Sequence, residues 1–249
     1  MVELQTLVEF LDETLQVSRF SDACPNGLQV EGRGRIERIV SGVTASAALL
    51  DAAVAARADA VLVHHGYFWR GERAVITGIR RRRLKTLLEY DISLIAYHLP
   101  LDAHAVFGNN AQLARVLDLE VVGPLNPEGI GNHGRIRAPV GASTLAAKIE
   151  RALGRKPLVI AGGEHSIATV AWCTGAAQGY IEQAANLGID AFISGEISEH
   201  TVHFAREAGI HYFAAGHHAT ERYGVQALGA HVADRFGVEH RFIDIDNPV

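Results

Sequence analysis

The sequence predicts an α/β protein built from two similar modules. Short apolar runs alternate with amphipathic stretches, which is typical of parallel strands joined by crossover helices. Two of these runs are each followed by a pair of histidines, His64-His65 and His217-His218. The order strand, glycine, helix, strand also occurs twice along the chain, which indicates related halves.

The first half opens with apolar residues at helical spacing and then alternates strands and helices. Pro100 disfavours a helical residue before it, so the stretch from His98 to His104 is expected to be a loop. Asn109 or Asn110 is expected to cap the next helix. The expected elements are a helix at 4–15, a strand at 36–41, a helix at 45–58, a strand at 60–63, a helix around 84–88, a strand at 92–97 and a helix ending at 117.

The second half repeats this order after residues 123–141, which hold Gly, Pro and Asn without periodicity and favour a connection. The expected elements are a helix at 143–153, a strand at 167–173, a helix at 180–187, strands at 191–194 and 211–215, and a long final helix. We expect a first module at 1–125, completed by 211–249, and a second module at 126–210.

Aligning the halves sets Gly42 against Gly175, Asp59-Ala60 against Asp190-Ala191, and His64-His65 against Gly195-Glu196. A second correspondence concerns the residues after a strand. His98 is followed by Asp102, and His217 by Glu221, each four residues later. Residues i and i+4 share one face of a helix, so His217 and Glu221 can point at one ion.

Composition excludes several classes of protein. The formal net charge of −5 gives no general attraction to nucleic acid, which is therefore not an expected partner. The two cysteines, Cys24 and Cys173, are too few for a disulfide framework or a thiolate zinc site, which fits a cytoplasmic protein. No apolar stretch reaches the ~20 residues that cross a bilayer, so no membrane association is expected.

Histidines and carboxylates at strand ends indicate a metal site, because the carboxyl ends of strands in an open α/β sheet form the ligand-binding crevice. Imidazole with carboxylate suits Zn, Fe, Mn, Co or Ni. Three histidines and two carboxylates are more ligands than a single metal site with an open coordination position needs. This number of ligands favours two divalent ions that share a bridging hydroxide. The candidate donors are His64, His65, Asp102, His217 and Glu221.

Several motifs together resemble those of the Nif-three-like family, whose bacterial members are catalogued as GTP cyclohydrolase I type 2 homologues. The resemblance runs from about Leu4 to the C-terminus. It is carried by the segments Cys24–Val30, Val63–Gly66, Tyr97–His104, Gly108–Asn110, Ser194–Glu196 and Ala215–Arg222. Tyr223 departs from the glycine expected there in many close relatives.

The resemblance implies a dinuclear metal site in a cleft between two intertwined α/β modules, with ligands falling on the five donors named above. It also implies a toroidal homohexamer, and a chain of 249 residues leaves no room for the inserted mid-chain domain of longer relatives. His98, His104 and Glu196 resemble positions near the metals. We take His98 and Glu196 as candidate catalytic residues, with orientation of the ligands as the alternative role.

The expected function is a metal-dependent hydrolase acting on a small, nucleotide-like substrate. The alternative is a non-catalytic metal scaffold, metal-delivery protein or regulatory ring. The basic run Arg80 to Arg83 is either a solvated helix face or a phosphate-binding part of the cavity. His200 and His203 are interpreted as solvated or interfacial residues.

Overall fold

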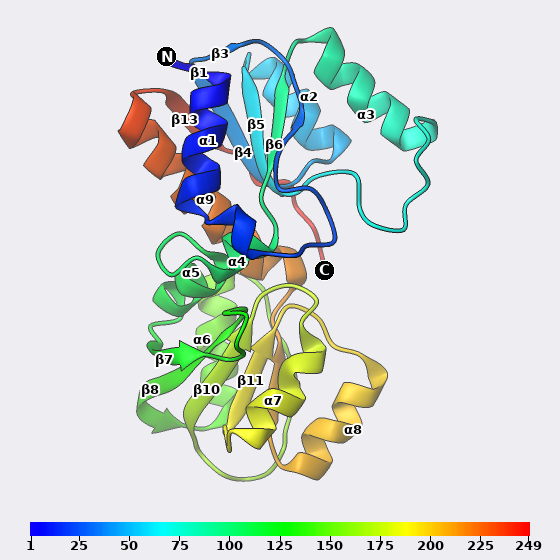
Figure 1. Cartoon of the computed structure of the whole chain (residues 1–249). Helices are drawn as coiled ribbons and strands as arrows, with labels where there is room; N and C mark the ends of the chain where they lie inside the picture. Colours follow the sequence, from blue (N-terminus) through cyan, green and yellow to red (C-terminus); the bar gives the residue numbers. More distant parts are fainter. The chain divides into compact units, whose positions relative to one another are not determined.

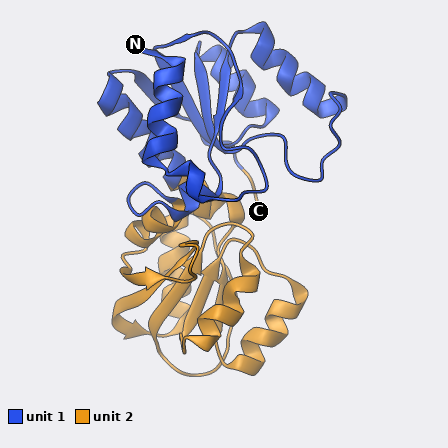
Figure 2. Ribbon diagram, in the orientation of Figure 1, with its two compact units in different colours: residues 1–108, 224–246 blue, residues 109–223, 247–249 orange.

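The computed structural model describes residues 1–249 as two compact units (Figure 1 and Figure 2). Unit 1 consists of residues 1–108 and 224–246, and unit 2 of residues 109–223 and 247–249. Helix α9 (His217–Phe236) therefore begins in unit 2 and continues into unit 1. None of the helices combines the length and the apolar character that a membrane span requires.

Unit 1 is built on a five-stranded sheet in the order β13-β4-β5-β6-β2, in which only β2 runs antiparallel to its neighbour. A two-stranded ladder of β1 and β3 belongs to the same unit. Besides its part of α9, the elements are β1 (Val2–Glu3), α1 (Leu4–Thr14), η1 (Val17–Arg19), β2 (Gly27–Val30), β3 (Arg35–Ile36), β4 (Arg38–Thr44), α2 (Ala47–Ala55), β5 (Ala60–His65), α3 (Gly78–Glu89), β6 (Ser93–Ala96), α4 (Leu99–Ala103) and β13 (Glu239–Phe242).

The central strands of unit 1 are buried on both faces, because successive side chains of a strand point to opposite sides. On β5, Ala60 and Leu62 pack in the cluster that contains α1 and α9, whereas Val61 and Val63 pack in the cluster that contains α2 and α3. The unit thus has three layers, with helices covering both faces of the sheet (Figure 1).

Unit 2 is built on a six-stranded sheet in the order β7-β8-β10-β11-β12-β9. The three strands β10, β11 and β12 are parallel, and each of the two strands beside them, β8 and β9, runs antiparallel to its neighbour. Besides the start of α9, the elements are α5 (Asn109–Val116), β7 (Glu120–Pro124), β8 (Asn132–Val140), α6 (Ala142–Leu153), β9 (Leu158–Ile160), β10 (Ile167–Cys173), η2 (Gln178–Tyr180), α7 (Ile181–Asn186), β11 (Ala191–Ser194), α8 (Glu199–Ala208) and β12 (His211–Ala214).

The α/β class predicted from the sequence is confirmed, and the internal repeat has a structural counterpart. The parallel strands β4, β5 and β6 of unit 1 correspond to β10, β11 and β12 of unit 2, and at one edge an antiparallel strand follows each set, β2 in unit 1 and β9 in unit 2. Asp59 accepts hydrogen bonds from the amides of Glu37 and Arg38, both at 2.8 Å. Asp190, its counterpart, accepts from the amides of Ala168 and Thr169 at 2.9 and 2.8 Å.

The strand register corrects one part of the alignment of the halves. Gly42 lies opposite Val63, whereas Cys173 lies opposite Ser194. Because Asp59-Ala60 and Asp190-Ala191 correspond, Gly42 matches Cys173 in the sheet, and the counterpart of Gly175 is Thr44. Aligning the two glycines as turns was wrong by two residues, since Gly42 is an interior residue of β4.

Two expected connections are regular structure instead. Pro100 does not prevent a helix, because it lies in the first turn of α4, where an amide donor has no intrahelical partner. Residues 123–141 were expected to be irregular, but they contain β8, which pairs with both β7 and β10. Leu113 of α5 packs in the core of unit 2, which is why that unit begins at Asn109 rather than after residue 125.

Candidate metal centre

In unit 1, the carboxyl ends of β5 and β6 bring His64, His65 and His98 together. The two strands are parallel and Val63 lies opposite Ala96, so the residues that follow these positions leave the sheet at the same edge. One ligand atom from each of the three imidazoles lies within 4.8 Å of the others. The ring centroids of His64 and His65 are 4.4 Å apart, although the two residues are adjacent in one strand.

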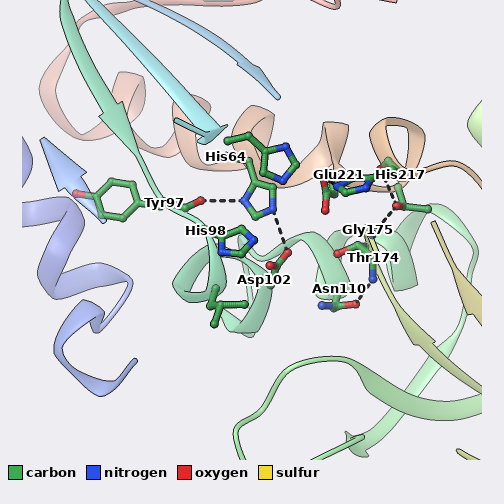
Figure 3. Close-up of polar contacts among 12 residues, drawn as sticks. His64, Tyr97, His98, Asp102, Asn110, Thr174, Gly175, His217 and Glu221 are labelled. Carbon is green, nitrogen blue, oxygen red and sulfur yellow. Dashed lines mark hydrogen bonds and ion pairs between the residues drawn. The ribbon is translucent and has the colours of Figure 1, made fainter. Parts of the chain in front are cut away.

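His64 is fully buried, and both of its ring nitrogens have defined neighbours (Figure 3). Nδ1–H donates to the carbonyl oxygen of Tyr97 at 2.9 Å. Nε2 lies 3.5 Å from Oδ1 of Asp102, which α4 presents one turn after His98. The backbone contact therefore fixes the tautomer and directs Nε2 toward a carboxylate, which is how metal-binding histidines are usually oriented.

His98 is held by Asp22, a residue that the sequence analysis did not single out. Nδ1–H of His98 donates to Oδ1 of Asp22 at 2.8 Å, and the Leu99 amide donates to Oδ2 at 2.9 Å. Asn26 also donates to this carboxylate. Burial alone would raise the pKa of Asp22, but the hydrogen bonds from His98, Asn26 and Leu99 together hold it well below its usual range. His98 is thus a fixed imidazole rather than a mobile loop residue.

Cys24 lies within the same neighbourhood, since its Sγ, an Asp22 oxygen and a His98 nitrogen are within 4.8 Å of one another. Burial raises the pKa of the Cys24 thiol to about 12, with Asp22 contributing in the same direction. Without a metal the sulfur is therefore protonated at neutral pH, and a bound metal would have to displace this proton. Cys24 thus stands beside the nitrogen and oxygen donors of this edge as a thiol.

In unit 2, His217 and Glu221 lie in the first turns of α9, which follows β12. Nε2 of His217 is 3.1 Å from Oε2 of Glu221, so the i,i+4 spacing does bring the two groups together. Nδ1–H of His217 donates to Oε1 of Glu196 at 2.6 Å. His217 therefore repeats the arrangement of His64, with Nδ1 anchored and Nε2 next to a carboxylate.

The charge around His217 is strongly negative. Burial would lower the pKa of His217, but Glu221 and then Glu196 raise it to about 9. Two carboxylates around one imidazole favour a bound cation, and a divalent ion can take the place of the proton.

Two glycines make room for His217 and Glu221. Gly175 follows β10 at φ +70°, and a Cβ there would overlap the Glu221 carboxylate. A Cβ on Gly195 would lie 2.7 Å from Cα of His217. The sequence identified Gly175 only as a turn, and the close approach to Glu221 explains why the turn needs glycine. The Gly175 amide donates to Thr220, which further fixes the start of α9.

Other candidates from the sequence have structural roles. Nδ1 of His104 accepts hydrogen bonds from the amides of Val106 and Phe107, so this histidine caps its own loop. Tyr223 donates to the carbonyl oxygen of Ala152, toward α6. His203 pairs with Glu199 on the exposed face of α8.

The residues present fit a site for hard or borderline divalent ions. Five donors, all imidazole or carboxylate, lie at the carboxyl edges of the two sheets, three in unit 1 and two in unit 2. In each unit an anchored imidazole faces a carboxylate (Figure 3). This is the donor chemistry that suits Zn, Fe, Mn, Co or Ni.

The chain is similar to known proteins along its whole length. A Pseudomonas aeruginosa protein named GTP cyclohydrolase 1 type 2 homolog is 59% identical over 99% of both chains. The solved structure of protein ybgI, described as of unknown function, matches with a TM-score of 0.97 and 51% identity over all of both chains. The structure of TTHA1606 from Thermus thermophilus matches with a TM-score of 0.92 and 35% identity, again over all of both chains.

The family description "Duf34/NIF3 (NGG1p interacting factor 3)" matches residues 2–248. The match includes both units, every candidate donor and the helix that continues from one unit into the other. This chain therefore belongs to the DUF34/NIF3 family.

Proposed function

We propose that this protein is a metal-dependent hydrolase in which His64, His65, Asp102, His217 and Glu221 hold two divalent metal ions. The observation that supports it most directly is the repeated arrangement of an anchored imidazole facing a carboxylate, once in each unit. The name of the curated relatives, GTP cyclohydrolase 1 type 2 homolog, also refers to a hydrolase.

A pair of divalent ions would supply a water molecule whose pKa is near neutrality and would polarise the group under attack. The protein's own residues would orient the ligands and move protons. Asp22 holds the proton of His98 on Nδ1, which leaves Nε2 to exchange a proton with the substrate. Glu196 binds Nδ1 of His217, so we assign it to positioning that ligand.

The first test is metal content. Protein purified without chelator should contain two metal ions per chain by inductively coupled plasma mass spectrometry. Asp102→Ala and Glu221→Ala should each lower that content and lower hydrolysis with it, because each removes a charged donor. Asp51→Ala, an exposed residue of α2, is the matched control and should keep the wild-type content.

The second test is a substrate screen with phosphoesters, cyclic amides and nucleotides. Hydrolysis that disappears with the metal and returns on its addition would support the proposal. Turnover that persists in Asp102→Ala after complete loss of metal would contradict it. A full metal complement with no turnover on any of these substrates would instead favour a scaffold or metal-delivery role.

A further inference from the structure

Arg155 lies in unit 2, at the edge of the sheet where α9 begins. β9 pairs antiparallel with β12, with Leu158 opposite Ala214. The chain just before β9 therefore runs beside the residues that follow β12. A Cβ on Gly216 would lie 2.9 Å from both Cδ and Nη1 of Arg155, so the guanidinium lies against the residue that precedes His217.

Nη1 of Arg155 is buried without a hydrogen-bond partner, in contrast to the guanidinium groups of several other arginines. Arg33 binds Asp59 at 3.0 Å, and Arg137 binds Asp118 at 3.1 Å. A buried donor with no acceptor destabilises a fold, so this guanidinium suggests a missing acceptor.

Arg155 as a residue is only partly buried, so part of its side chain reaches solvent although Nη1 itself does not. Gly216 has φ +101° and no side chain, and any larger residue would displace the guanidinium from its place. The arrangement thus combines a partly buried cation, whose Nη1 lacks an acceptor, with a neighbouring metal-ligand candidate.

From these contacts we propose that Arg155 binds a phosphate group of the substrate next to His217. This inference rests on the proposed hydrolase function and specifies the substrate class, a phosphate ester or nucleotide. The planar guanidinium can donate two parallel hydrogen bonds to phosphate oxygens, which gives both affinity and orientation. A phosphate held there would place the substrate beside Gly216, at the start of the helix that carries His217.

The basic run on α3 fits this role less well. Arg80 pairs with Glu72 and donates to the carbonyl oxygen of Arg73, so its guanidinium is already bound. Arg81 and Arg82 are exposed, as expected for a solvated helix face. Nε of Arg83 is also buried without a hydrogen-bond partner, but Arg155 lies against Gly216, the residue that precedes the candidate ligand His217.

The test is the binding of inorganic phosphate, measured by isothermal titration calorimetry on protein purified without chelator. Ionic strength is held constant, since salt screens such contacts. Arg155→Met, which keeps the packing on Gly216 and removes the charge, should weaken phosphate binding by about tenfold or more. Arg151→Met removes an equal charge from the exposed end of α6 and should bind phosphate like the wild type.

Metal content is measured on every sample, so that a loss of metal is not mistaken for a loss of the arginine. Arg155→Gln provides a second variant if Arg155→Met does not fold. Acetate in place of phosphate should bind more weakly, which distinguishes a phosphate site from a general anion site. Equal phosphate affinity in the wild type and a folded Arg155 variant, or no binding by the wild type, would overturn the inference.

Kinetics separate this inference from the proposed function. For a phosphoester substrate, Arg155→Met should raise KM by about tenfold with little change in kcat, and KM for an uncharged ester should not change. If Asp102→Ala loses its metal but keeps its activity, the metal-dependent hydrolase mechanism is wrong. The phosphate titration still tests the role of Arg155 in that case. An unchanged KM in Arg155→Met, with metal and activity intact, would defeat only the role of Arg155.

Discussion

Asp22 connects three segments at the edge of unit 1. Its carboxylate accepts hydrogen bonds from His98, from the Leu99 amide and from Asn26, and its side chain is 3% exposed. Local sequence patterns could not reveal this residue, because His98 and Leu99 lie 76 and 77 positions away. By contrast, His64, His217 and Glu221 stand out locally, as histidine pairs or through i,i+4 spacing.

We expect Asp22→Ala to destabilise unit 1 by about 3 kcal/mol, because buried donors lose a charged acceptor. The pKa of Asp22 is lowered in the folded state, so its contribution is present above about pH 4 and is lost as the pH falls below that value. Hydrogen exchange of the Leu99 amide, followed by mass spectrometry, measures the effect at pH 7. Exchange in Asp22→Ala as slow as in the wild type would contradict this prediction.

At the scale of elements, most helices and the parallel strands that hold the core were predictable, whereas α4 and the antiparallel strands β2, β7, β8 and β9 were not. β10 and β11 have the predicted bounds, because continuous apolar runs identify strands buried on both faces. β7 and β8 are largely exposed, and the alternation of Ile136, Ala138 and Val140 in β8 stands among Gly and Pro residues that favour a connection. Their pairing depends on a partner strand, which a local pattern does not show.

Asp59 and Asp190 each tie the start of one parallel strand to the next. We expect Asp190→Ala to lower the free energy of unfolding of unit 2 by about 2 kcal/mol, because two strand amides and the Thr169 hydroxyl lose their acceptor. Urea unfolding followed by Trp172 fluorescence reports this unit, since Trp172 lies in its core.

The pH dependence provides the control for Asp190. Burial would raise the pKa of Asp190, but the hydrogen bonds from Thr169 and Ala168 lower it overall. Its contribution should therefore be present above about pH 4 and decrease as the pH falls through the lowered pKa. Asp190→Asn should show less of this decrease, and Asp51→Ala should change stability by less than about 0.5 kcal/mol.

At the scale of the whole molecule, the sequence predicted the α/β class and the duplication. It placed the boundary between units differently, because α5 and β8 were not recognised as parts of the second sheet's unit. The donors that lie close in each unit were predicted from motif resemblance and spacing. Their anchoring by Tyr97, Asp22 and Glu196 comes from contacts between distant segments and required the fold.

The family resemblance also predicts a homohexamer, and native mass spectrometry should give six times the chain mass of 26.8 kDa. Self-association needs apolar surface, and Ile76 and Leu88, which are 61% and 62% exposed, line a groove of about 480 Å³ beside α3. Leu88→Asp should reduce the mass, whereas Leu187→Asp, exposed beside α7, serves as the control. A monomeric wild type would refute the hexamer.

The path of the chain through α9 has a consequence for synthesis. When a ribosome has released residues 1–223, all of unit 2 except its last three residues has emerged, yet unit 1 still lacks β13 and most of α9. The apolar face of α1 would then be without Val225, Leu228 and Val232, which pack in the same cluster. The amino-terminal unit must therefore wait for the end of translation to close its core, and a nascent chain stalled near residue 223 should bind chaperones through that uncovered face.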